Sequence, residues 1–295
     1  MVSGREAAKR VELLRRLMRS CGLCPRRCGI NRPEGERGYC GAGPEAVVAS
    51  AGPHFGEEPC LVGRGGSGTI FLAGCNLRCA FCQNEDISHR VVGEEMETAS
   101  LARRMRSLER GGCENINFVT PTHFTAALAA AIVEARRQGL RVPIVWNSSG
   151  YESAEVLRRL DGLVEIYMPD FKFSRSQGAA RYCNAPDYPE RAREAIGEMH
   201  RQVGDLVLEG GVARKGVLVR HLVMPGGAEE GCEVLDWLAS VSRRMVVNVM
   251  GQYHPAGEAV RSPIGPLGAI ARRPTLQEVQ RVWNHAQGLG LRLAE

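Results

Sequence analysis

The sequence predicts an α/β protein in which a partial (β/α)6 barrel follows an N-terminal cysteine-rich segment. Between residues 69 and 249, six short runs rich in β-branched residues alternate with longer stretches of helical periodicity. Such a series requires right-handed crossovers and a parallel sheet. Because a closed barrel of this kind has eight units, six units predict one that stays open.

The pattern fixes the expected elements in order. The predicted strands are residues 69–73, 115–119, 143–146, 164–168, 217–223 and 245–249, and the predicted helices are 100–110, 124–138, 153–160, 189–203 and 229–240. Gly139 is placed to cap the second of these helices, since glycine accepts a left-handed backbone at a helix C-terminus. Thr275 and Glu278 form a capping-box pattern that begins a last helix, which ends near Gly288.

The chain before the barrel has a different character. Residues 5–20 predict an amphipathic helix with a basic outer face, because its apolar positions have helical spacing: Ala8, Val11, Leu14 and Met18. Residues 21–66 are rich in Cys, Gly and Pro, so we expect them to fold around a metal or over a neighbouring surface. The predicted divisions are 1–66 for this helix and segment, 67–260 for the barrel, and 261–295 for a C-terminal loop and helix packed on it.

Composition favours a soluble protein of the cytoplasm. The net charge of +5 comes mainly from arginines interspersed with Asp and Glu, which is typical of a solvated surface rather than a nucleic-acid interface. We find neither eighteen consecutive apolar residues nor the apolar core of a secretory signal, so no membrane partner is expected. The eleven cysteines, an odd number, favour reduced thiols that serve as metal ligands over a set of disulfides.

Cys75, Cys79 and Cys82 lie just after the first predicted strand. A [4Fe–4S] cluster normally takes four soft thiolate ligands, and three leave one iron open for another ligand. The alternative is a structural zinc site, but such a site usually has a fourth nearby ligand and paired Cys-x₂₋₄-Cys knuckles. The spacing therefore favours a cluster with an open iron.

The CxxxCxxC spacing, with Phe81 directly before the third cysteine, resembles the radical S-adenosylmethionine (SAM) signature. The stretches CNLRCAFCQN, VTPTHF, WNSSGY, YMPDFKF, VRHLVMPG and QYHP resemble the pyruvate formate-lyase activating-enzyme-like branch of that superfamily, over most of the chain. The resemblance implies a barrel of the radical SAM type that holds a [4Fe–4S] cluster and SAM. It also implies an electron donor such as flavodoxin or ferredoxin, and reductive cleavage of SAM to a 5′-deoxyadenosyl radical that abstracts hydrogen from a substrate.

Polar side chains at the ends of the predicted strands indicate the same site without reference to a family. Barrel enzymes gather their chemistry at the carboxyl ends of their strands. Thr120 and Thr122 follow the second predicted strand, and Asp170 and Lys172 follow the fourth. The other polar residues expected at this rim are Asn147, Ser148, Ser149, Arg220, Tyr253 and His254.

The resemblance assigns several of these residues, together with Phe81, to the cofactor site. Thr120 and Thr122 stand where many radical SAM enzymes carry a Gly-Gly-Glu that receives the SAM amino group, with simple turn chemistry as the alternative. Asn147 and Ser149 match a stretch that binds the ribose hydroxyls or the methionine carboxylate.

Four further rim residues have assignments of the same kind. Lys172 matches a lysine that reaches the SAM carboxylate, and Asp170 matches an aspartate that helps to hold a monovalent cation. His254 matches a histidine near the adenosyl group, with a histidine satisfied by backbone groups as the alternative. Arg220 is assigned to a substrate carboxylate or backbone, or else to a structural ion pair.

A second set of cysteines lies in the N-terminal segment, at Cys21, Cys24, Cys28 and Cys40. Four thiolates satisfy either tetrahedral zinc or an auxiliary [4Fe–4S] cluster, and the spacing does not choose between them. Cys60 is a spare candidate ligand. The remaining cysteines are expected to be small buried side chains: Cys113, Cys183 and Cys232.

Three functions are compatible with these features. The first is a radical SAM enzyme that abstracts hydrogen from a glycine or another peptide position of a partner protein, which the activator-like stretches favour. The second is a radical SAM enzyme that acts on a small metabolite. The third is an iron–sulfur or zinc protein for electron transfer or nucleic-acid binding. Several glycyl-radical activators carry ferredoxin-like cysteines soon after the cluster motif, whereas this chain has no cysteine between Cys82 and Cys113.

Overall fold

The structure, a computed structural model, describes residues 3–294 and confirms the predicted α/β fold with a mostly parallel sheet. The central strands run parallel in the order β9, β8, β6, β5, β4, β2. They are β2 (Ser67–Leu72), β4 (Ile116–Val119), β5 (Ile144–Ser148), β6 (Ile166–Pro169), β8 (Val212–Leu222) and β9 (Val246–Met250). Each coincides with a predicted strand, because short apolar runs rich in β-branched residues are typical of buried parallel strands.

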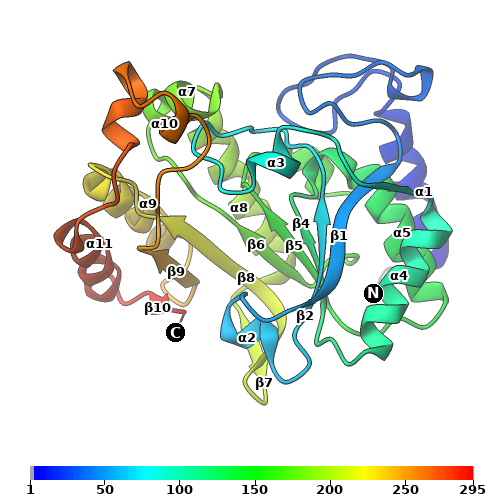
Figure 1. The fold of residues 1–295 in the computed structure, drawn as a ribbon. Coiled ribbons are helices and arrows are strands. Elements are labelled where there is room, and N and C mark those ends of the chain that lie inside the picture. Colours follow the sequence, from blue (N-terminus) through cyan, green and yellow to red (C-terminus); the bar gives the residue numbers. More distant parts are fainter. Residues whose placement is uncertain (1–2, 295) are drawn as a thin grey trace.

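Helices connect the strands and cover the outside of the sheet (Figure 1). The longer ones are α1 (Gly4–Arg16), α4 (Thr98–Arg110), α5 (Thr125–Arg137), α7 (Ser176–Cys183), α8 (Tyr188–Val203), α9 (Ala228–Val241) and α11 (Leu276–Gly288). The short ones are α2 (Pro59–Val62), α3 (Glu85–Ser88), α6 (Ala154–Leu157), α10 (Glu258–Arg261), and the 3₁₀ turns η1 (Arg32–Glu34), η2 (Thr122–Phe124) and η3 (Gly265–Ile270). Both predicted caps are present, since Gly139 has a φ of +93° after α5, and Thr275 and Glu278 form the capping box of α11.

Three helix predictions differ from the structure. The helix expected over 153–160 is the single turn α6, because the chain turns at residues 158–160 and again at Gly162, just before β6. Helix α7 was not predicted, since its sequence SQGAARYC has few apolar residues to set a period. The prediction that Ala8 is a buried position is wrong: α1 buries Ala7 with Val11 and Leu14, and Ala8 is exposed.

Residues 46–54 form β1 (Ala46–His54), which the prediction of an irregular segment missed. This strand pairs antiparallel with β2 on one side and with β3 (Glu94–Met96) on the other. Small residues make up most of its sequence, AVVASAGPH, so the alternation that marks a strand is weak. β1 thus joins the sheet from before residue 66, and the division at that residue stays a prediction.

Two short strands complete the sheet at its other side. β7 (Val207–Glu209) pairs antiparallel with β8, and β10 (Arg292–Leu293) pairs parallel with β9. The path through the sheet therefore runs from β10 to β3 without closing. In the part of the chain that the structure describes, no helix is long and apolar enough to cross a membrane.

An apolar layer fills one end of the barrel interior. There Leu61 of α2 packs in one buried cluster with Val145, Ile166 and Leu218 from three strands. Because side chains alternate along a strand, the residues two positions further along β5 and β8 face the same interior. These residues are Asn147 and Arg220, so the interior changes from apolar to polar toward the carboxyl ends of the strands.

Gly150 lies in the turn after β5, where the rim is closely packed. Its φ is +76°, and a Cβ there would lie 2.2 Å from the carbonyl oxygen of Asp170. Gly150→Ala should therefore lower the free energy of unfolding by about 1–3 kcal/mol. Gly197→Ala in α8 is the control, because nothing lies within 4 Å of such a Cβ, and it should raise that free energy by about 0.5–1 kcal/mol. Urea unfolding measures both, and equal effects would contradict the close packing.

Candidate active site

The loop after β2 carries the three cysteines of the cluster motif. Cys75 and Cys79 are each only 8% exposed, and Cys82 is partly buried. The backbone N–H of Leu77 donates to Cys75 Sγ over 3.3 Å, and the Ser88 hydroxyl donates to Cys82 Sγ over 3.2 Å. Hydrogen bonds of this kind stabilise thiolates, which are the form that binds metals.

While no metal is bound, the thiols of this loop keep their protons. Burial raises the pKa of Cys75 to about 12. The contact with Cys183, and then burial, raises the pKa of Cys79 well above its usual value, while the positive charge of Lys172 acts in the opposite direction. A bound metal removes the protons outright and converts the loop into a set of anionic ligands.

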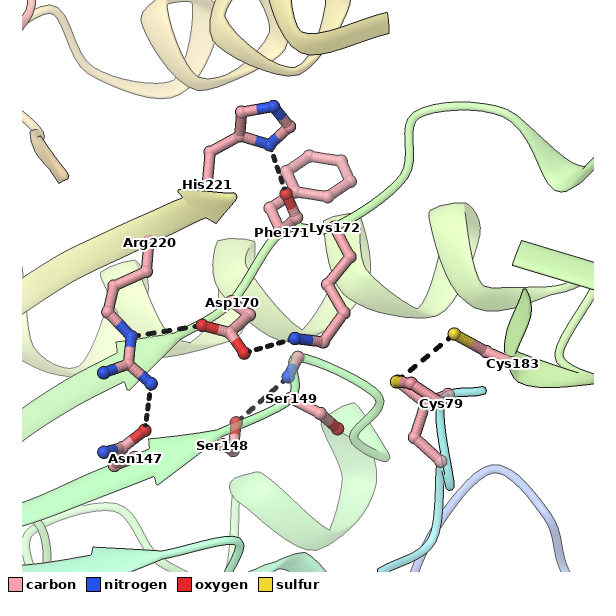
Figure 2. A network of polar contacts seen from close by, with 12 residues as sticks. Cys79, Asn147, Ser148, Ser149, Asp170, Phe171, Lys172, Cys183, Arg220 and His221 are labelled. Carbon is pink, nitrogen blue, oxygen red and sulfur yellow. Dashed lines mark hydrogen bonds and ion pairs between the residues drawn. The ribbon is translucent and has the colours of Figure 1, made fainter. Parts of the chain in front are cut away.

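A network of polar side chains connects three strands at the rim (Figure 2). Lys172 Nζ donates to Asp170 Oδ2 over 2.6 Å, and Arg220 Nε donates to Asp170 Oδ1 over 3.1 Å. The same guanidinium donates through a terminal nitrogen to Asn147 Oδ1 over 2.7 Å. The structure therefore brings together four of the predicted rim residues: Asn147, Asp170, Lys172 and Arg220.

The charges in this network support one another. Burial alone would raise the pKa of Asp170, but Lys172 and Arg220 lower it below its ordinary value. Burial opposes the charge of Lys172, but Asp170 raises the pKa of Lys172 above its ordinary value. All three groups are thus charged at neutral pH, and both oxygens of the Asp170 carboxylate accept hydrogen bonds from cations. The monovalent cation expected at Asp170 stays a prediction.

Tyr188, at the start of α8, holds the rim in shape and was not identified from the sequence. Its hydroxyl oxygen accepts the backbone N–H of Lys172 over 2.9 Å. The same hydroxyl lies 2.9 Å from the carbonyl oxygen of Ser149 and 3.0 Å from that of Asp170. One buried side chain therefore fixes the turns that follow β5 and β6.

Three other residues predicted for the site make their contacts outside this polar network: Thr122, Phe81 and His254. The Thr122 hydroxyl donates to the buried carboxylate of Glu152 over 2.8 Å, so its polar atom is engaged within the protein. Phe81 is buried in an aromatic group with Phe173, Tyr182 and Tyr253. His254 is exposed, and its Nδ1 lies 3.2 Å from Gln83 Nε2.

Two rim residues, Thr120 and Ser149, have unusual local structure. Thr120 has a φ of +60°, which is rare for a β-branched residue and marks a strained turn after β4. Ser149 Oγ is buried without a hydrogen-bond partner among the described residues. A buried hydroxyl of this kind has an unmet capacity to bind a ligand.

Glu57 and Cys183 also reach the site, and no sequence pattern identified either of them as a site residue. Glu57 comes from the loop before α2, and its Oε2 lies 3.8 Å from a terminal nitrogen of Arg220. Cys183, expected to be a small buried side chain, ends α7 with its Sγ 3.3 Å from that of Cys79 (Figure 2). Cys60, the spare candidate ligand, instead packs against the apolar layer at the far end of the barrel.

The cysteines do not surround a single metal ion. Within residues 3–294, no three side chains of His, Cys, Asp or Glu converge as the ligands of one ion. A [4Fe–4S] cluster is larger than an ion, so its ligands lie further apart than those of zinc.

Two surface hollows lie away from the rim, one beside Arg27 and α8 and the other between the end of α5 and β7.

Glu152 gives the rim a pH-dependent stability. Its Oε1 accepts hydrogen bonds from Thr122 and from Trp146 Nε1, and burial raises its pKa to about 7 against the effect of these donors. The folded protein then binds a proton more tightly than the unfolded chain, so stability falls as the pH rises from 4.5 to about 7.

Glu152→Gln should remove this fall, because an amide oxygen accepts the same two hydrogen bonds. The difference in free energy of unfolding between variant and wild type should grow by about 3 kcal/mol over that pH range, with the variant more stable at the upper end. Urea unfolding at a series of pH values measures it. Glu155→Gln, at an exposed position on α6, is the control, and parallel pH profiles for wild type and Glu152→Gln would contradict the assignment.

Comparison with known proteins identifies similar chains. The profile of the Radical SAM superfamily matches residues 69–238. An uncharacterized protein of Methanocaldococcus jannaschii is 31% identical over 297 residues, covering 96% of this chain and 79% of its own length.

Two structures of the radical S-adenosylmethionine methyltransferase TsrM from Kitasatospora setae are also similar. The one with tryptophan and a SAM analogue has a TM-score of 0.50 at 14% identity, over 77% of this chain and 52% of its own. The one with cobalamin and a [4Fe–4S] cluster has a TM-score of 0.46 at 17% identity, over 62% of this chain and 36% of its own. The chain thus spans about half of TsrM or less, and the likeness concerns the fold.

Proposed function

Because the chain belongs to the radical SAM superfamily, we propose that it is an activating-enzyme-like member that abstracts hydrogen from a glycine or another peptide position of a partner protein. The observation that carries this proposal is the Asp170–Lys172 pair. It lies at the carboxyl end of β6, within the stretch YMPDFKF that resembles the glycyl-radical activators. The open sheet supports the proposal too, since an unclosed barrel leaves room for a loop of a partner.

Membership in the superfamily gives the enzyme its cofactors, a [4Fe–4S] cluster and SAM. When bound, these supply a 5′-deoxyadenosyl radical through reductive cleavage of SAM. The residues of this chain fit the cluster, because Cys75, Cys79 and Cys82 are soft ligands on one loop with N–H and O–H donors aimed at two of the sulfurs. An electron donor of the flavodoxin or ferredoxin type completes the proposal.

The rim residues are proposed to bind and orient SAM and the substrate. Lys172 carries a positive charge beside the cluster loop, which suits a carboxylate. Asp170 holds that ammonium and the Arg220 guanidinium at fixed positions. Ser149, in the neighbouring turn, offers a buried hydroxyl that has no partner within the described part of the chain. Arg220, with Asn147 and Glu57 around it, is placed to position a polar group of the substrate.

Replacement of Lys172 tests the assignment of the SAM carboxylate. Lys172→Met should weaken SAM binding by about tenfold to a hundredfold, since a hydrogen bond to a charged group contributes about 1.5–3 kcal/mol. Lys215→Met is the control, because Lys215 is exposed on β8. Titration calorimetry on anaerobically reconstituted protein measures the affinity, with iron analysis alongside. Unchanged affinity at wild-type iron content would refute the assignment.

The proposed substrate class is tested by following deuterium. Reduced enzyme and SAM are incubated with a protein fraction from cells grown on α-deuterated glycine, and separately with the small-molecule fraction of the same cells. Transfer of deuterium into 5′-deoxyadenosine from the protein fraction, with a glycyl-type radical in electron paramagnetic resonance, is the expected result. Transfer from the small-molecule fraction alone would establish a metabolite substrate instead. Absence of SAM cleavage under all conditions would favour an electron-transfer role.

A further inference from the structure

The four cysteines of the N-terminal segment come together in the folded chain. Cys21, Cys24 and Cys40 are 2%, 4% and 4% exposed, and Cys28 is partly buried. The backbone N–H of Cys21 donates to the carbonyl of Ile30 over 2.8 Å, which folds the chain back after Cys28. A Cβ at Gly38, two residues before Cys40, would lie 2.9 Å from Cys28 Sγ, and the backbone N–H of Gly29 donates to the carbonyl of Cys21 over 3.1 Å. Residues far apart in the segment therefore meet in one place.

Arg32 is a buried cation that lies beside these cysteines. It is only 2% exposed, and one terminal nitrogen lies 3.5 Å from Cys40 Sγ. Its other hydrogen-bond partners among the described residues are the carbonyls of His123 and Gly43, and its Nε has none. A buried guanidinium is costly without an anion, and a free thiol is neutral at neutral pH. Metal-bound thiolates would provide the missing negative charge.

We propose that Cys21, Cys24, Cys28 and Cys40 hold a second metal centre, separate from the cluster of Cys75, Cys79 and Cys82. The ligand chemistry is four thiolates. Because no three of the described side chains converge as the ligands of one ion, these thiolates suit a [4Fe–4S] cluster, whose ligands lie further apart than those of zinc. On binding, each thiol gives up its proton to solvent and forms one sulfur–metal bond. The centre then carries a net negative charge, which Arg32 partly neutralises.

Metal analysis of the full-length protein tests this centre without any measurement of activity. The protein is reconstituted anaerobically with iron, sulfide and zinc, and its metals are counted by mass spectrometry. Cys24→Ser and Cys40→Ser should each lose about four irons relative to wild type, whereas loss of about one zinc ion instead would contradict a cluster at this place. Cys232→Ser, in α9, should lose neither.

A second variant keeps the test decisive if the serine variants fold poorly. The triple replacement Cys75/Cys79/Cys82→Ala removes the other cluster and should still retain the N-terminal metal, with a far-ultraviolet circular dichroism spectrum like that of wild type. A folded triple variant without metal would overturn the proposal. Full wild-type metal content in Cys24→Ser and Cys40→Ser would overturn it as well.

Discussion

The carboxylate of Asp170 is the point at which the strands of the site are joined. It receives Lys172 from its own strand end and Arg220 from β8, and Arg220 in turn reaches Asn147 on β5. A buried carboxylate between two cations keeps all three charged, because each charge lowers the free energy of the others. Removal of Asp170 would leave Lys172 without its carboxylate partner and Arg220 with only Asn147 and Glu57, so the rim depends strongly on this one group.

The sequence was sufficient for the parts of the fold that depend on local pattern. The six central strands were predicted because β-branched runs recur at regular intervals, and the rim followed from the rule that polar residues at strand ends meet at one edge. Asn147, Asp170, Lys172 and Arg220 do meet there. These predictions needed no knowledge of contacts between distant segments.

The features that the sequence did not reveal depend on such contacts. Tyr188, Glu57 and Cys183 reach the rim through contacts with residues distant in the chain. Thr122 follows a strand as predicted, yet its hydroxyl is drawn to Glu152, a partner thirty residues away in the chain. The role of a polar residue is decided by what the folded chain places opposite it.

The superfamily match begins at residue 69, whereas the N-terminal segment contacts the cluster loop directly. Arg26 donates through Nε to the carbonyl of Asn76 over 3.0 Å, and the Tyr39 hydroxyl donates to the carbonyl of Leu77 over 3.3 Å. The guanidinium of Arg26 also lies 3.9 Å from the centre of the Tyr39 ring. The segment outside the match is therefore part of the wall against which the cluster motif is packed.

The position of β1 has a practical consequence for anyone who shortens this protein. β1 lies before residue 67 and pairs with β2 along almost its whole length. A chain begun at residue 67, at the start of β2 and just ahead of the matched region, would expose the unpaired edge of β2. Unpaired edges recruit strands from other molecules, so such a fragment would tend to associate with copies of itself.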